Sequence, residues 1–170
     1  MTEPPAGGRP ALLVLGTGSE LRRDDALGRH VAAQVAADGV AEVEVLSVHQ
    51  LTPELAADLE GRALVIFVDA AVDVDTVTVR RVRPATSSAS THHLDPAALL
   101  RLADVLGWVP GRALAVHVPA HDLGLGTELS PRGRAVAAEA VEVVAGLLAT
   151  ARDPGSTTPG SVEAQVSGSA

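Results

Sequence analysis

The sequence contains no cysteine, no lysine and no tyrosine, and it has a single phenylalanine and a single tryptophan. Without cysteine, the chain cannot form a disulfide, an iron–sulfur cluster, a thiolate zinc site or a cysteine nucleophile. Its 13 basic residues are all arginine and are outnumbered by 21 acidic residues, which gives a net charge of −8. Because nucleic-acid binding needs a basic face and usually aromatic stacking platforms, we expect no nucleic-acid partner.

Long hydrophobic segments are also missing. No run reaches the roughly 18 apolar residues that are needed to span a bilayer. The first ten residues, MTEPPAGGRP, have no apolar core of the kind that a signal peptide requires. We therefore expect a cytoplasmic protein that has no membrane partner and is a monomer.

The length and composition favour one folded domain. The chain has 170 residues, of which 46% are hydrophobic, and a length of about 100–200 residues is usual for a single core. Residues 1–10 are rich in proline and glycine and are predicted to form a flexible arm. Residues 151–170 are rich in serine, glycine and threonine and are predicted to be a disordered tail. The folded domain is therefore expected at residues 11–150.

The order of the predicted elements indicates an α/β fold. Short apolar runs indicate buried strands, and residues 76–82 alternate valine with threonine or arginine, as a half-exposed edge strand does. We expect three α/β/α layers: a five-stranded, mostly parallel twisted sheet with one antiparallel edge strand, and helices on both faces. The strands are predicted at residues 11–16, 43–47, 63–68, 76–82 and 113–118, and the helices at about 24–37, 95–106 and 130–148, with a short one opening at Thr52.

Three polar residues stand out because they follow predicted strands. Asp25 lies in the loop after the first strand, Asp69 closes the third, and His92 lies in the polar loop before residue 95. In such sheets, ligands bind beyond the carboxyl ends of the strands. Two carboxylates and an imidazole form an incomplete shell that suits a divalent transition ion with further ligands of its own. Alternatively, Asp25 is a helix cap or a surface charge, Asp69 is a cap or an ion-pair partner, and His92 is a bystander.

A dinucleotide-binding fingerprint is not present. The loop begins Gly16-Thr17-Gly18, but Leu21 occupies the position where the third glycine is needed. The second strand also ends in Ser47 rather than in the acidic residue that would hold a ribose. The glycines are therefore better explained by a tight turn at the end of the strand.

Four segments, in this order, resemble the hydrogenase maturation endopeptidases of the HycI/HybD type, over about residues 11 to 149. The segments are LVLGTGSELRRDDALG at 13–28, VIFVDA at 65–70, STHHL at 90–94 and VHVPAHDLGLGTELSP at 116–131. The resemblance implies an endopeptidase that removes the C-terminal extension of the nickel-iron hydrogenase large-subunit precursor after nickel insertion. It further implies that Asp25, Asp69 and His92 contact nickel carried by that precursor. No tightly bound cofactor is expected.

The segment after the second strand departs from the common pattern of that family. Many members carry an acidic, glycine-rich segment at this point, whereas this chain has His49, Gln50 and Leu51. This His-Gln-Leu version resembles that of the subgroup that serves bidirectional, NAD-linked hydrogenases. The resemblance implies that these three residues recognise the precursor. The alternative is a plain turn into the next helix.

The sequence defines the chemistry less well than the site. One route is metal-polarised attack of water on the cleaved carbonyl, with Asp25 or Asp69 as the general base. A non-catalytic member of the same fold that binds metal or precursor is an alternative. A phosphoacceptor receiver domain would also place an aspartate at Asp69, but it needs a lysine, and the sequence has none.

Overall fold

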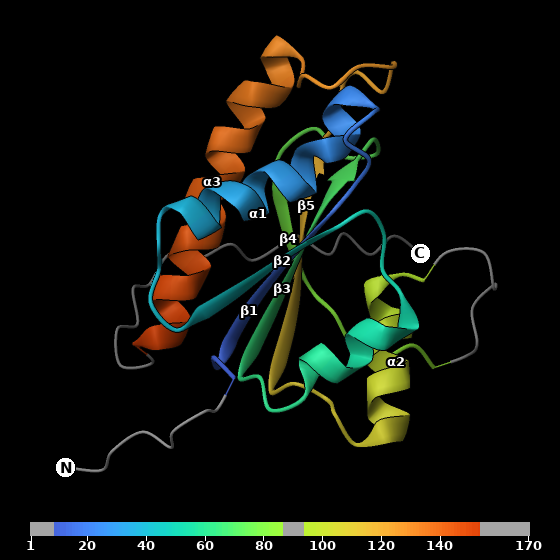
Figure 1. Ribbon diagram of the computed structural model, residues 1–170, viewed down its shortest axis with the longest axis vertical. Coiled ribbons are helices and arrows are strands. Elements are labelled where there is room, and N and C mark those ends of the chain that lie inside the picture. Colours follow the sequence, from blue (N-terminus) through green and yellow to red (C-terminus); the bar gives the residue numbers. More distant parts are fainter. Residues whose placement is uncertain (1–8, 87–93, 154–170) are drawn as a thin grey trace, which may run out of the picture.

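The computed structural model describes residues 9–86 and 94–153. Five strands form one sheet in the order β2-β1-β3-β5-β4, with β4 antiparallel to β5 and the other neighbours parallel. Figure 1 shows α1 and α3 on one side of this sheet and α2 on the other. The elements are β1 (Leu12–Thr17), η1 (Arg23–Ala26), α1 (Leu27–Ala37), β2 (Val43–Val48), η2 (Pro53–Leu59), β3 (Leu64–Ala71), β4 (Thr78–Arg81), α2 (Pro96–Leu106), β5 (Arg112–Pro119) and α3 (Pro131–Arg152).

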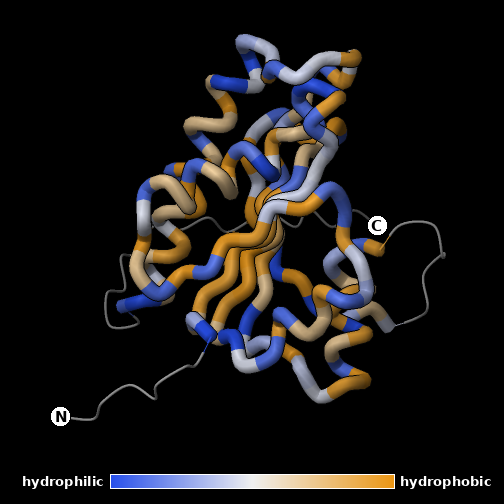
Figure 2. Tube along the Cα trace, in the orientation of Figure 1, coloured by the Kyte–Doolittle hydropathy of each residue, from blue (hydrophilic) through white to orange (hydrophobic). Residues whose placement is uncertain are grey.

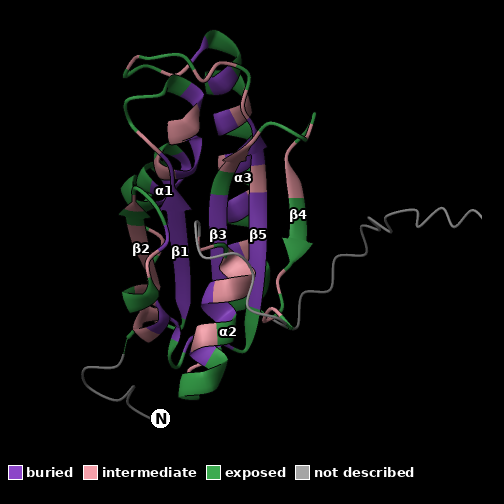
Figure 3. Ribbon diagram, turned by 90° about the vertical axis from the view of Figure 1, so that its right-hand side faces the viewer, coloured by how far each residue is buried: buried purple, intermediate pink, exposed green. Residues whose placement is uncertain are grey.

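Two hydrophobic cores cover the two faces of the sheet. Alternate residues of β3 point to opposite faces, so Ile66 packs under α1 and α3, whereas Phe67 packs under η2 and α2. The central strands form a continuous hydrophobic band in Figure 2, and β1, β3 and β5 are the buried strands in Figure 3. β4 is mostly exposed at the edge. The three-layer architecture and the antiparallel edge strand predicted from the sequence are therefore confirmed.

Several element boundaries differ from the prediction. β3 continues through Asp69 to Ala71, because its carboxyl half pairs with β5 as far as Pro119. The short helix predicted at Thr52 is the 3-10 helix η2. α3 runs to Arg152, past the predicted domain edge at 150. Residues 1–8 and 154–170, which contain most of the predicted arm and tail, lie outside the described residues.

The start of the first helix also differs from the prediction. Asp24 was expected to cap a helix over 24–37, but it lies within the 3-10 turn η1, and α1 begins at Leu27. The Asp24 side chain is fully buried and makes no cap hydrogen bond. The two helix starts predicted at Asp95 and Ser130 are confirmed, since each side chain accepts a hydrogen bond from the first turn of its helix.

Close packing of α1 onto the sheet fixes the loop that carries Asp25. Gly16 of β1 and Gly28 of α1 face each other so closely that a Cβ on either would overlap backbone atoms. A Cβ on Gly28 would meet the carbonyl oxygens of Val68 and Thr17. The loop after β1 is thereby held beside the carboxyl end of β3. Within the described residues, no helix is long and apolar enough to cross a membrane.

Candidate functional site

Asp69 projects from the carboxyl end of β3 on the face covered by α2 and η2. Its Oδ1 accepts hydrogen bonds from the Thr17 hydroxyl at 2.7 Å and from the Ala70 N–H at 3.0 Å. Desolvation by the surrounding protein raises the pKa of the Asp69 carboxyl, and the nearby Asp25 carboxylate raises it further. The two hydrogen bonds and the neighbouring His117 oppose that rise in pKa without cancelling it. Asp69 remains exposed to solvent, so the carboxyl is crowded by protein but accessible.

Asp25 lies in the 3-10 turn η1, half-buried beside the end of β1. Its Oδ2 accepts a hydrogen bond from the Ser19 N–H at 3.0 Å, which closes the loop between β1 and η1. Gly18 allows this closure, because its φ of +138° and the approach of the Asp25 carbonyl leave no room for a Cβ. Within the described part of the chain, Asp25 Oδ1 and Asp69 Oδ2 have no hydrogen-bond donor.

Both carboxylates line one pocket of about 670 Å³ at the carboxyl ends of β1, β2 and β3. His49, Gln50 and Leu51, which follow β2, form part of its wall. The structure therefore brings two of the three predicted metal ligands together with all three predicted recognition residues. The complete lining is Thr17, Gly18, Ser19, Arg22, Asp25, His49, Gln50, Leu51, Phe67, Asp69, Leu94, Asp95 and Pro96.

The third predicted ligand, His92, lies outside the described residues. The chain re-enters the described part at Leu94, and Leu94, Asp95 and Pro96 line the pocket. Among the described residues, no group of three or more histidine, aspartate or glutamate side chains could hold a metal ion. A metal ion bound in this pocket would therefore need ligands beyond Asp25 and Asp69.

Asp24 has a different role from its neighbour. Its Oδ1 accepts from the Ser130 N–H at 2.8 Å, and its Oδ2 accepts from the His121 N–H, the Asp122 N–H and the Ser130 hydroxyl at 2.8–3.1 Å. Desolvation acts to raise the pKa of the Asp24 carboxyl, but these hydrogen bonds outweigh it and the pKa is lowered. Ser130 Oγ also caps α3 by accepting from the Gly133 N–H. Asp24 therefore joins the loop after β1 to the loop between β5 and α3.

Two arginines strengthen this junction. Arg22 pairs with Gly126 in an isolated bridge, and its Nε donates to the Leu123 carbonyl at 3.4 Å. Arg23, at a φ of +43°, forms an ion pair with Asp122 at 2.6 Å. The loop that carries Asp25 is consequently anchored on both sides, by the sheet and by the loop before α3.

Sequence reasoning missed two neighbours of Asp69. Gly16 of β1 pairs with Val68 of β3, so the next residues, Thr17 and Asp69, lie side by side. Asp69 in turn pairs with His117 of β5. Thr17, Asp69 and His117 therefore form a polar row across three parallel strands, on the same face as Phe67. The break from apolar residues to a polar residue near the end of each strand was the available signal, but it required the register.

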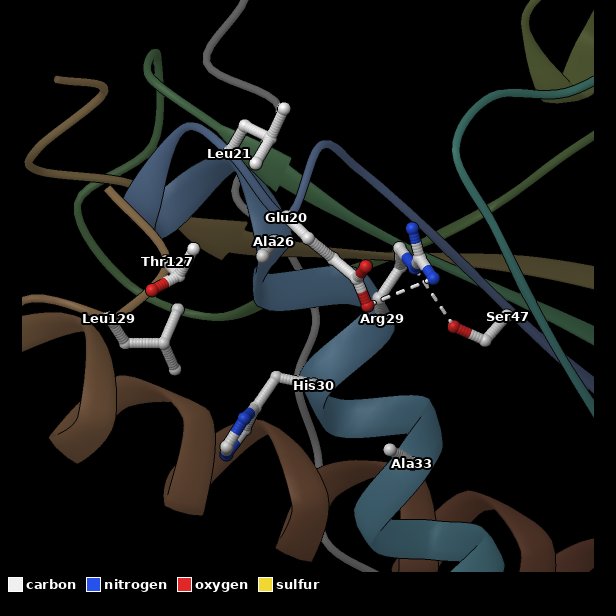
Figure 4. Close-up of a pocket in the computed structure, with 9 residues that line it drawn as sticks. All are labelled: Glu20, Leu21, Ala26, Arg29, His30, Ala33, Ser47, Thr127 and Leu129. Carbon is white, nitrogen blue, oxygen red and sulfur yellow. Dashed lines mark hydrogen bonds and ion pairs between the residues drawn. The ribbon is translucent and has the colours of Figure 1, made fainter. Parts of the chain in front are cut away.

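A second pocket, of about 430 Å³, lies on the other side of the same loop. Figure 4 shows Arg29 between Glu20 and Ser47, while His30 and Leu129 lie toward α3. Arg29 contacts Glu20 at 2.9 Å and Ser47 at 3.1 Å. Because the pocket's one carboxylate is already paired, this pocket offers less for metal binding or acid–base chemistry than the Asp25–Asp69 pocket.

Comparison with known proteins identifies the fold. No protein-family model and no curated protein sequence matches the chain. Among solved structures, the hydrogenase maturating endopeptidase HybD from E. coli has a TM-score of 0.68 and 27% identity, over 85% of this chain and 93% of that chain. The solution structure of an endopeptidase from Escherichia coli gives a TM-score of 0.67 and 27% identity over the same shares.

A third neighbour comes from an archaeon. The [NiFe] hydrogenase maturation protease HycI from Thermococcus kodakarensis KOD1 has a TM-score of 0.65 at 20% identity, over 84% of this chain and 95% of that chain. The fold is that of the hydrogenase maturation endopeptidases. Several close structural neighbours of the chain are thus named as endopeptidases or proteases, which are hydrolases.

Proposed function

We propose that this protein is an endopeptidase that removes the C-terminal extension of a nickel-iron hydrogenase large-subunit precursor after nickel insertion. One observation carries the proposal. In a fold shared with maturation endopeptidases, Asp25 and Asp69 line one pocket, and each keeps one carboxylate oxygen without a donor among the described residues. Fixed hydrogen bonds orient each carboxylate through its other oxygen. The site is therefore suited to a cation delivered with the substrate.

The nickel ion belongs to the precursor and acts as the recognition element. Asp25 and Asp69 supply two oxygen ligands, and we propose His92 as the third protein ligand. Two carboxylates and one imidazole leave coordination positions for the precursor's own ligands. A precursor without nickel cannot form this shared shell, so it stays uncut. In this proposal the enzyme carries no tightly bound cofactor.

Hydrolysis at this pocket needs a base, and we assign that role to Asp69. The surrounding protein raises the pKa of Asp69, so its carboxylate accepts a proton more readily. The water oxygen bonds to the carbonyl carbon while its proton passes to Asp69, and the carbonyl π electrons move to the oxygen. When the intermediate collapses, the C–N bond breaks and the proton passes to the leaving amine.

The wall formed by His49, Gln50 and Leu51 supports a finer assignment. These residues follow β2 and line the pocket together with Asp25 and Asp69, so a bound precursor would contact them. We propose that they select the precursor of a bidirectional, NAD-linked hydrogenase. In this proposal the protein acts in the cytoplasm as a monomer on a nickel-loaded precursor.

Cleavage of purified precursor tests the proposal. The wild-type protein is incubated with the nickel-loaded precursor of an NAD-linked hydrogenase, with the same precursor lacking nickel, and with a nickel-loaded precursor of another hydrogenase class. Mass spectrometry of the intact precursor detects the loss of a C-terminal peptide. We expect cleavage of the first precursor and none of the second. Cleavage of the third at the same rate would contradict the assignment to NAD-linked hydrogenases.

Site variants test the residues. We expect Asp25→Asn, Asp69→Asn and His92→Ala each to slow cleavage by about 10²-fold or more, because each loses a metal ligand or a base. Asp73→Asn is the matched control, since Asp73 is exposed in the loop after β3. Normal cleavage by all three site variants would refute the site. Nickel-dependent binding of the precursor without a change in mass would favour a non-catalytic binding protein.

A further inference from the structure

Arg22 brings a positive charge to the pocket that contains the two carboxylates. Arg22 is one of the residues that line the pocket with Asp25 and Asp69. We propose that Arg22 is a further catalytic residue, whose guanidinium stabilises the negative charge that forms on the carbonyl oxygen of the peptide bond being cut. This inference rests on the proposed endopeptidase function and assigns to it a residue with a separate chemical task.

The backbone of Arg22 is fixed on both sides. Its N–H donates to the Ser19 carbonyl at 3.3 Å, and its own carbonyl accepts from the Asp25 N–H at 2.9 Å. The isolated bridge to Gly126 holds the same residue against the loop before α3. Arg22 and Asp25 therefore belong to one hydrogen-bonded turn, so the backbone of Arg22 is fixed relative to the backbone of Asp25.

The side chain of Arg22 is anchored but not neutralised. Nε donates to the Leu123 carbonyl at 3.4 Å, and no acidic side chain of the described residues pairs with the guanidinium. The adjacent Arg23 differs in this respect, because Asp122 neutralises it at 2.6 Å. Arg29, across the loop, is likewise paired with Glu20 at 2.9 Å. The guanidinium of Arg22 thus has no acidic partner among the described residues and is available to bind a ligand.

The chemistry of the pocket creates a need for this charge. Attack of water turns a neutral carbonyl into an oxyanion, close to the two carboxylates that line the pocket. A donor of positive charge that is already in place stabilises this oxyanion in the transition state. Among the described residues that line the pocket, Arg22 is the sole arginine, and the sequence contains no lysine. A guanidinium stays protonated throughout, so it stabilises the oxyanion without exchanging a proton.

The test compares single-turnover cleavage of nickel-loaded precursor by wild type, Arg22→Met and Arg22→Lys. We expect Arg22→Met to lower the rate constant at saturating enzyme by about 10²–10³-fold, with the half-saturating concentration changed less than about threefold. Arg22→Lys should recover part of the rate, because it keeps a charge and a donor. Added guanidinium ion should raise the rate of Arg22→Ala. Arg101→Met, at an exposed position of α2, makes the same chemical change outside the pocket and should cleave normally.

The outcomes separate this inference from the proposed function. If the wild type leaves the precursor intact, the proposed function fails, and the inference fails with it. If the wild type cleaves and Arg22→Met cleaves equally fast, the inference alone is wrong. A raised half-saturating concentration at an unchanged rate constant would also overturn it, because Arg22 would then bind substrate without stabilising the transition state. Thermal melts verify folding, and if Arg22→Met does not fold, the rate of Arg22→Lys and the response to guanidinium decide the question.

Discussion

Asp24 and Asp25 are adjacent identical residues with different environments. Asp24 is fully buried and accepts four hydrogen bonds from the loop between β5 and α3. Asp25 is half-buried, accepts one hydrogen bond from Ser19 and lines the pocket. Sequence reasoning assigned the metal-ligand role to Asp25 rather than to Asp24, and Asp25 is the one of the two that lines the pocket. It could not find the role of Asp24, because that role depends on Ser130, which is 106 residues away.

Replacement of Asp24 by asparagine should destabilise the fold. An amide NH₂ at the position of either carboxylate oxygen would face at least one donor that now has an acceptor, and the negative charge would be lost, so we expect a loss of roughly 2–4 kcal/mol. The burial and the lowered pKa of Asp24 add a dependence on pH. The pKa of Asp24 is lower in the folded protein than in the unfolded chain. The stabilisation is therefore complete at pH values above the unfolded pKa of about 3.9, and it is lost as the pH falls through the folded pKa.

Urea unfolding at a series of pH values measures this effect. The difference in free energy of unfolding between wild type and Asp24→Asn should be largest near neutral pH and should shrink in acid. Asp104→Asn, at an exposed position of α2, should show neither effect. A difference between wild type and Asp24→Asn that does not change with pH would show that the charge of Asp24 contributes nothing to its junction.

At the scale of elements, the contact of α1 with the sheet determines where the pocket forms. A Cβ on Gly28 would meet the backbone carbonyls of Val68 and Thr17. Val68 precedes Asp69 in the sequence, and the Thr17 hydroxyl donates to the Asp69 carboxylate. Gly146, in α3, has no atom within 4 Å of an added Cβ. The same substitution in these two helices should therefore have opposite effects.

We expect Gly28→Ala to destabilise the protein by roughly 1–3 kcal/mol, because its methyl group forces the helix away from β1 and β3. It should also slow precursor cleavage, since the displaced backbone supports Asp69. Gly146→Ala should stabilise the protein by roughly 0.5–1 kcal/mol through the better helix propensity of alanine, with normal cleavage. Thermal denaturation and the cleavage assay measure both. A neutral Gly28→Ala would mean that the close contact is not needed.

The sequence predicted these elements well where the local pattern determines them. Asp95 and Ser130 were found as caps because a cap, a following proline and an apolar stripe lie within a few residues of each other. The end of β3 was missed because Asp69 and two alanines carry no strand signal of their own, and pairing with β5 extends the strand. The start of α1 was missed because Asp24 satisfies the local rule for a cap while bonding elsewhere.

At the scale of the whole molecule, the topology was the strongest guide to the site. Parallel strands with helical crossovers bring their carboxyl ends to one edge, so residues after β1, β2 and β3 could be expected to meet there. Asp25, Asp69 and His49 do line one pocket. Distances and hydrogen bonds could not be predicted, because they depend on register and on the approach of the loop between β5 and α3. The position of His92 remains a prediction.

The amino ends of the strands, opposite the pocket, contribute to stability. Arg62, two residues before β3, is 2% exposed and forms an ion pair with Glu44 at 2.6 Å. It also donates to the carbonyls of Asp58 at 2.8 Å and Pro10 at 2.5 Å. These contacts tie the N-terminal segment, η2 and β2 together at the amino ends of the strands. A substitution at the amino ends of the strands should therefore change stability without changing cleavage at the pocket, which lies at the carboxyl ends.

Arg62→Met tests that separation. The substitution keeps most of the buried aliphatic length but removes the charge and the three donors, so we expect a loss of roughly 2–4 kcal/mol in the free energy of unfolding. Urea unfolding measures this loss, and cleavage assayed well below the melting temperature should equal that of the wild type. Asp25→Asn should show the reverse, with nearly normal stability and slow cleavage. If folded Arg62→Met lost cleavage, the two ends of the sheet would be coupled. The coupling would run through β3, which begins two residues after Arg62 and contains Asp69.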